Sequence, residues 1–287
     1  MEMNYTLFLK AFQEKYRGIK DMQLLFQYLR EELQYLILHA LYTKSVYSIY
    51  FMGGTLLRLS YGINRFSEDI DLALSASNSH FPTTELHDDI ARAFSEKVTG
   101  FKVTGKLNTN RNVVKLMLSF AQILFDTGIS PLESQTIKIK IELDTNPPAH
   151  ATFDRKTYRS MAGDYMISTH DLGTTFAGKL GAVLMREYQK GRDFYDLQWY
   201  LQRSPKISMN LPYLNANLAQ QHQSAFQSPH EVLNTVIGKV KHLDLALLRS
   251  DLERFIIMDK NSFEEWLNRY ISDTLALLSD YQSSHES

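Results

Sequence analysis

Apolar and polar residues follow two different periods along this chain, and each period predicts a different kind of element. Over 21–42, DMQLLFQYLREELQYLILHALY, apolar residues recur three and four positions apart, which predicts a long amphipathic helix. SIYFM at 48–52 is a short apolar run that stops at two glycines, and it predicts a buried strand, as does 69–74. Over 135–144, QTIKIKIELD, apolar and charged residues alternate strictly, which predicts a strand with one buried face and one polar face.

The remaining pattern divides the chain into a strand-rich half and a helical half. Helices are predicted at 55–61 and 81–99, and strands at 101–107 and 112–120. TNPPAH at 145–150 ends the strand-rich half. From Ser168, which resembles a capping box with Asp171, the signals are helical, with helices predicted over 169–188, 192–203, 230–242, 244–257 and 262–282. We therefore expect an α/β domain over 1–160 and an all-helical domain over 161–287, with the functional site in the cleft between them.

Composition narrows the classes of partner and environment. The formal net charge of −1 provides no general attraction for nucleic acid, so a polyanionic partner needs a local basic patch. The chain has no cysteine, which excludes disulfides and thiolate zinc sites and fits a reducing compartment. The amino terminus has no apolar block of signal-peptide length, and no long uncharged apolar run occurs, so we expect a cytoplasmic protein without a membrane segment.

Two carboxylates inside an apolar run are the first candidate chemistry. Asp69 and Asp71 lie one residue apart in a predicted strand, so both point to the same face. Two like charges about 4 Å apart repel by roughly 4 kcal/mol at an effective dielectric near 20. Such a pair is stable with a cation between the acids or with a shared proton. Mg²⁺ prefers carboxylate oxygens and keeps positions open for phosphates, whereas the structural alternative is a solvated acid pair on an edge strand.

A glycine turn upstream of the acids is the second candidate. Gly53, Gly54 and Thr55 follow a predicted strand and open a predicted helix. Glycines allow close backbone approach, a helix start offers free N–H groups to an anion, and Thr55 adds a hydroxyl. Alone, these residues are typical of a plain tight turn. Coupled to the two acids at this distance, they predict a nucleoside-triphosphate site.

These residues carry a resemblance to a known family. The turn together with Asp69-Ile70-Asp71 resembles the signature of the nucleotidyltransferase superfamily typified by DNA polymerase β. More narrowly, GGTLLRLSYGINRFSEDIDLAL resembles the AbiEii-type nucleotidyltransferases, the toxin half of bacterial type IV toxin–antitoxin pairs, through a GGT-x-L-R opening and an R-x-S-x-D-h-D close, where h is hydrophobic. The similarity returns at KIEL (140–143) and at FAGKLGAVLMREYQKGRDFYDL (176–197). It implies a polymerase-β-like core with a mixed sheet, followed by an all-helical domain.

The resemblance also implies a reaction and roles for individual residues. A nucleoside monophosphate would pass from an NTP to an acceptor hydroxyl, with Asp69 and Asp71 binding Mg²⁺ or Mn²⁺. Glu142 would be the third carboxylate and complete the metal site, although Asp144 on the same strand face stays open as the third metal ligand. The implied nucleotide-binding residues are Gly53, Gly54, Thr55, Arg65, Ser67 and Lys179, and Asp196 would orient Lys179. The structural alternatives are a solvated sheet face for the acids, a solvated helix lysine, and an i,i+4 salt bridge between Arg192 and Asp196.

The implied partners are RNA, particularly tRNA, as the acceptor, and a separately encoded antitoxin protein. Two other functions fit the same residues. One is a nucleotidyltransferase acting on a small molecule such as an aminoglycoside antibiotic, and the other is a non-catalytic domain that binds nucleotide or a partner protein. Tyr195, Trp199 and Tyr200 recur at helical intervals and are predicted to lie in the core.

Overall fold

The computed structural model describes residues 3–44, 48–78, 98–110 and 112–284, and the chain forms two compact units. The sheet unit consists of Met1–Thr55, Ser67–Asn146 and Asp154–Thr169. The helical unit consists of Leu56–Phe66, Pro147–Phe153 and His170–Ser287, so it takes two short segments from before residue 160. The chain leaves the sheet unit within helix α3 (Gly53–Tyr61) and returns to it at Ser67, just before the two candidate acids.

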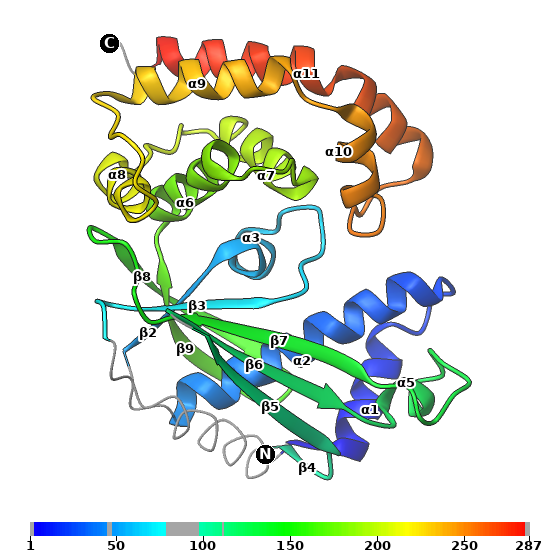
Figure 1. Ribbon diagram of the computed structural model, residues 1–287. Coiled ribbons are helices and arrows are strands. Elements are labelled where there is room, and N and C mark those ends of the chain that lie inside the picture. Colours follow the sequence, from blue (N-terminus) through cyan, green and yellow to red (C-terminus); the bar gives the residue numbers. More distant parts are fainter. Residues whose placement is uncertain (1–2, 45–47, 79–97, 111, 285–287) are drawn as a thin grey trace. The chain divides into compact units, whose positions relative to one another are not determined.

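The sheet unit contains a mixed sheet of seven strands in the order β5-β6-β7-β3-β2-β9-β8. Their bounds are β2 (Ile49–Met52), β3 (Ile70–Leu74), β5 (Val103–Asn110), β6 (Val113–Phe120), β7 (Ile137–Asp144), β8 (Phe153–Ser160) and β9 (Gly163–His170). Strand β3 is parallel to β7 and antiparallel to β2. Helix α2 (Met22–Lys44) lies along the sheet, as Figure 1 shows, and α1 (Tyr5–Lys15), α5 (Ile123–Asp126) and the short pair β1 (Met3–Asn4) and β4 (Val98–Thr99) complete the unit. The predicted α/β class and mixed sheet are confirmed.

The alternation in β7 positions the polar face of the sheet. Its four apolar side chains, from Ile137 to Leu143, are buried, and Lys140, Glu142 and Asp144 between them are half-buried. In β3, Asp71 is half-buried while every other side chain of the strand is buried. An acid on each of two neighbouring strands therefore lies on one partly solvated face inside an otherwise apolar sheet.

The helical unit packs six helices of the described residues around one apolar cluster. They are α6 (Leu172–Met185), α7 (Gly191–Leu201), α8 (Leu211–Gln220), α9 (Pro229–Lys241), α10 (Leu245–Leu252) and α11 (Lys260–Ser283). Helices α9 and α11 lie side by side (Figure 1). The ring of Tyr200 stacks on Phe176 with centroids 4.5 Å apart, and Tyr195 and Trp199 are buried with it, so their predicted core position is confirmed.

Three sequence predictions differ from the structure. Strands β8 and β9 follow TNPPAH, so the strand-rich part does not end there. Ser168 lies within β9, and the capping box is wrong: Asp171 alone caps α6, its Oδ1 accepting a hydrogen bond from the Thr174 N–H at 2.8 Å. Helices α1 and α8 were not predicted, and the helix predicted over 81–99 lies outside the described residues except for its last two, which form β4.

Within the described ranges, no helix combines the length and the apolar character needed to cross a membrane.

Candidate active site

The glycine turn and the second acid are built against each other. Gly53, the first residue of α3, has a φ of +77°, a conformation that residues with a side chain rarely adopt. Directly before it, Met52 pairs with Asp71 across β2 and β3. A methyl group on Gly53 would lie 2.9 Å from the Cβ and Cγ atoms of Asp71, and closer still to Oδ2. The absence of a side chain at position 53 therefore makes room for the Asp71 carboxylate, and Gly54 follows as the second residue of the helix.

The segment that precedes β3 is held from two sides. The Thr55 hydroxyl is fully buried and donates a hydrogen bond to the backbone carbonyl of Asp69. From α2, the Gln34 side-chain amide donates to the carbonyls of Ser67 and Glu68, each at 3.0 Å. The Thr55 hydroxyl is therefore used by a hydrogen bond within the protein, and this bond orients Asp69.

Strand register distinguishes the two candidates for the third acid. Asp71 is paired with Glu142 across the parallel strands β3 and β7, whereas Asp144 is paired with Ala73. The Asp144 carboxylate accepts a hydrogen bond from the Asn146 N–H at 2.9 Å, and burial raises its pKa. Glu142 is therefore the neighbour of Asp71, and we call Asp69, Asp71 and Glu142 the acid cluster.

Two lysines that sequence reasoning missed neutralise part of the acid cluster. The Lys140 Nζ atom lies 2.9 Å from Asp69 Oδ2 and 3.2 Å from Glu142 Oε1, and the Lys115 Nζ atom lies 3.0 Å from the same Glu142 oxygen. Burial acts to raise the pKa of Glu142, but the hydrogen bonds from both lysines outweigh it and the pKa is lowered. Strict alternation puts Lys140 on the face of Glu142, so the signal was present in KIEL.

The donors of the acid cluster suit a hard divalent ion. All are carboxylate oxygens, and a cation, the Lys140 ammonium, already lies between two of them. Among the described residues, no group of three acidic or imidazole side chains is arranged to hold an ion. An ion at this place would therefore complete its coordination with water or substrate phosphates, as Mg²⁺ commonly does.

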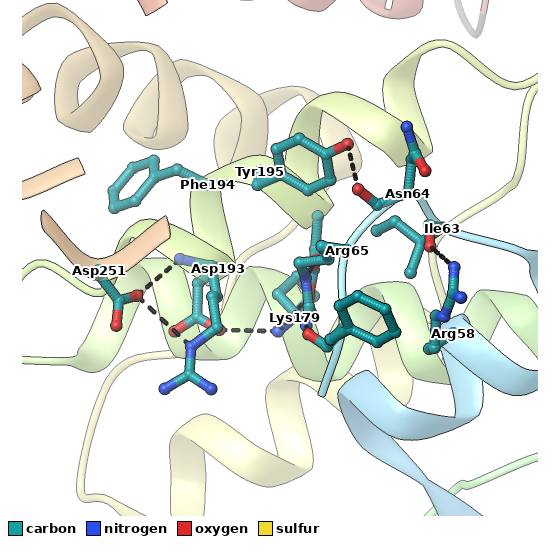
Figure 2. A network of polar contacts seen from close by, with 12 residues as sticks. Arg58, Ile63, Asn64, Arg65, Lys179, Asp193, Phe194, Tyr195 and Asp251 are labelled. Carbon is teal, nitrogen blue, oxygen red and sulfur yellow. Dashed lines mark hydrogen bonds and ion pairs between the residues drawn. The ribbon is translucent and has the colours of Figure 1, made fainter. Parts of the chain in front are cut away.

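In the helical unit, Lys179 lies among acids from the next helix. Its Nζ atom, on α6, is 2.7 Å from Asp193 Oδ1 and 2.8 Å from Asp196 Oδ2, both on α7. Figure 2 shows the contact between Lys179 and Asp193. The Lys179 side chain is 13% exposed and that of Asp196 is fully buried. Burial acts to lower the pKa of Lys179, but the two acids outweigh it, so the pKa is raised and the lysine stays charged.

Arg65 completes this arrangement from the loop after α3. Its Nε and Nη2 atoms donate to the two oxygens of Asp196 at 2.5 and 2.6 Å, and Nη1 donates to the Phe66 carbonyl at 2.9 Å. The arginine is buried, and Figure 2 shows it beside Lys179. A second arginine, Arg186, lies 2.9 Å from Asp193 Oδ2. We call these five residues the buried charge network: Arg65, Lys179, Arg186, Asp193 and Asp196.

The two glycines around Lys179 have different surroundings. A Cβ atom on Gly181 would lie 2.8 Å from the Asn217 side chain on α8, whereas one on Gly178 would only touch Tyr213 at 3.8 Å. The close approach at Gly181 is therefore made by helix α8. The i,i+4 pair between Arg192 and Asp196, both among the described residues, does not form. Asp196 pairs with Arg65 and Lys179. Arg192 lies 3.5 Å from Asp251.

Comparison with known proteins shows that this fold is of the nucleotidyltransferase type. A candidate nucleotidyltransferase from H. pylori aligns over 90% of this chain and 95% of its own, with 19% identity and a TM-score of 0.54. JHP933 from Helicobacter pylori aligns over 91% of this chain and 96% of its own, with 20% identity and a TM-score of 0.49. No protein with a curated function matches the sequence. The model of the nucleotidyl transferase AbiEii toxin family, of type IV toxin–antitoxin systems, matches residues 40–273, and the chain belongs to this family.

Proposed function

We propose that this protein acts in the cytoplasm as a toxin that transfers a nucleoside monophosphate from an NTP to a hydroxyl of RNA, with tRNA as the favoured class, and that a separate antitoxin protein restrains it. Family membership supports the nucleotidyltransferase chemistry and the toxin role. The observation that carries the reaction is the acid cluster on one sheet face, with Asp71 seated against the Gly53 turn.

In this proposal each part of the sheet unit has one task. Asp69 and Asp71 would hold Mg²⁺ or Mn²⁺, which supplies charge stabilisation at the reacting phosphorus when it is bound. The N–H groups at the start of α3, at Gly53 and Gly54, and the Ser67 hydroxyl would bind phosphate oxygens. Glu142 would complete the metal site or accept the proton of the attacking hydroxyl, and both roles need the ionised carboxylate that its two lysines favour.

The buried charge network has a separate task. Lys179 would place its ammonium toward the triphosphate, because its side chain keeps a small exposed fraction that a phosphate can reach. Arg65 and Asp196 are buried, so we assign them a positioning role. Asp196 holds Lys179, and Arg65 fixes the orientation of Asp196. This revises our expectation that Arg65 contacts the nucleotide.

Transfer of labelled nucleotide tests this function. The purified protein is incubated with each α-labelled NTP, Mg²⁺ or Mn²⁺, and total bacterial RNA. Asp69→Asn and Asp71→Asn should each lower incorporation by about 100-fold or more, because both remove charge at the reacting centre. Glu142→Gln should cost about 10²- to 10⁴-fold as lost general-base catalysis. Asp144→Asn is the matched control on the same strand and should retain most of the activity.

The acceptor and the cellular effect separate this proposal from its alternatives. Label recovered in RNA, together with slowed growth on expression that Asp71→Asn relieves, supports the proposal. Label recovered only in an aminoglycoside or another small acceptor would replace RNA as the substrate class. Growth inhibition that persists in Asp71→Asn would indicate a binding protein, and transfer that persists in this variant would refute the acid cluster as the site.

A further inference from the structure

A cavity of about 470 Å³ lies within the helical unit, and all the residues that line it belong to this unit. It is bounded by the end of α6, the segment 186–190, the start of α7 and the last turns of α9. Val183, Phe194 and Leu243 form part of its apolar wall. Its volume lies in the range of small-molecule sites, which are mostly apolar with a few convergent polar groups.

The rim of this cavity carries more positive than negative side chains. The cations Arg186, Lys190 and Lys239 line it, against the two acids Glu187 and Asp193. Asp193 is already paired with cations of the buried charge network. Among the described residues, the side chains of Lys190 and Lys239 have no hydrogen bond or ion pair, so both ammonium groups can bind a ligand.

The surroundings of Lys190 favour an anion further. Its ammonium is half-buried, and burial, followed by repulsion from Arg192 and Arg186, lowers its pKa. Asp193 offsets only part of this repulsion, so a negative group in the cavity would stabilise the Lys190 ammonium further. Phosphate, with several acceptor oxygens, is the biological anion that best matches converging lysine and arginine donors.

An exposed aromatic ring at the same cavity adds a second chemical preference. Tyr188 is 67% exposed, lines the cavity, and has the Arg186 guanidinium 6.0 Å from its ring centroid. Exposed aromatic rings beside a basic groove are the usual platform on which nucleic-acid bases stack. The cavity thus combines donors for a phosphate with a ring for a base.

We propose that this cavity binds a phosphorylated nucleoside, with Lys190 and Lys239 at the phosphate and Tyr188 against the base. The proposal rests on the proposed function, in which both the NTP and the RNA acceptor carry this chemistry. It assigns either the NTP or the RNA acceptor to a binding site in the helical unit.

Equilibrium binding to the full-length protein tests this, in EDTA so that no transfer occurs. The probes are each of the four NTPs and a fluorescein-labelled 12-nucleotide RNA with a free 3′ hydroxyl. Lys190→Gln and Lys239→Gln should each weaken at least one probe by about fivefold or more, because each removes a phosphate contact. Lys241→Gln is the matched control: it lies in the same last turn of α9 as Lys239 and does not line the cavity, so binding should stay within about twofold.

The pattern of losses identifies the source of the phosphate. Loss for RNA alone assigns the cavity to the acceptor, and loss for an NTP alone assigns it to the donor. A wild-type protein that binds neither probe, or variants that bind both probes like Lys241→Gln, would overturn the proposal. Because binding needs no turnover, this result is independent of the transfer assay: a protein that binds through Lys190 yet transfers nothing would refute the proposed function and leave the cavity assignment standing.

Discussion

Replacing Gly53 by alanine should disable the acid cluster although none of its acids is substituted. The new methyl group would lie 2.9 Å from Cβ and Cγ of Asp71, and closer to Oδ2, so the carboxylate has to move. The β2–β3 pairing holds the backbone of Asp71 opposite Met52, which leaves side-chain rotation or a local shift of the strands. Either change moves the carboxylate away from the turn.

The expected effect of Gly53→Ala has two parts, a loss of stability and a loss of transfer rate, which a control variant can separate. A side chain at a φ of +77° costs about 1–2 kcal/mol of backbone strain. Displacing a reacting group by about 1 Å costs about 100-fold in rate. Gly128 has a φ of +75° and nothing within 4 Å of its missing Cβ, so Gly128→Ala carries the strain without the collision.

Urea denaturation and nucleotide transfer are measured on both variants. Gly128→Ala should lose about 1–2 kcal/mol in the free energy of unfolding from strain alone, and Gly53→Ala should lose at least as much because the collision adds to the strain. Only Gly53→Ala should also lose about 100-fold in transfer. If Gly53→Ala transfers nucleotide within about threefold of Gly128→Ala, the contact between this glycine and Asp71 does not position the acid, and the reasoning is refuted.

Two further predictions concern buried ionisable groups. Asp196→Asn should lower the free energy of unfolding by about 3–5 kcal/mol, because two buried cations lose their partner. Asp164→Asn, which breaks an exposed ion pair, should leave the urea midpoint nearly unchanged. Equal small effects of the two substitutions would contradict this prediction. Burial lowers the pKa of His170 to about 4, so between this pH and about 6.5 the unfolded chain binds more protons than the folded protein. The free energy of unfolding should therefore fall by about 3 kcal/mol as the pH drops through this window. His170→Phe should remove that part of the slope in urea denaturation measured from pH 7 to pH 4; an unchanged slope would show that other groups cause it.

The features that sequence reasoning predicted correctly are local. The alternation in β7 and the glycine stop after β2 each depend on a few adjacent residues, and both elements occur where expected. Strand β8 was missed because its first half, Phe153 to Lys156, is largely exposed and charged, so it has no apolar period to detect. Helix α8 was missed although its signals are local: Asn210 caps it, a proline stands in its first turn, and Leu211, Leu214 and Leu218 recur at helical spacing.

The partners of the candidate site residues depend on contacts between distant parts of the chain. Arg65 and Asp196 are 131 positions apart, and no local pattern pairs them. The contact of Lys140 with Asp69 needs the parallel register of β3 and β7, which only the folded sheet defines. Sequence reasoning therefore identified residues with reactive side chains, while their neutralisation and orientation required the structure.

The two charged groups have opposite imbalances, and this difference supports assigning them to different ligands. The acid cluster has three carboxylates against two lysine ammonium groups, so its remaining charge favours a cation. The buried charge network has three cations against two carboxylates, so its remaining charge favours an anion. A metal ion and a triphosphate carry these two charges, and the proposed reaction uses both. Removing an acid from the network should therefore weaken the fold more than phosphate binding. Removing Lys179 leaves two cations against two acids, so the excess positive charge is lost and the effect should fall first on the triphosphate.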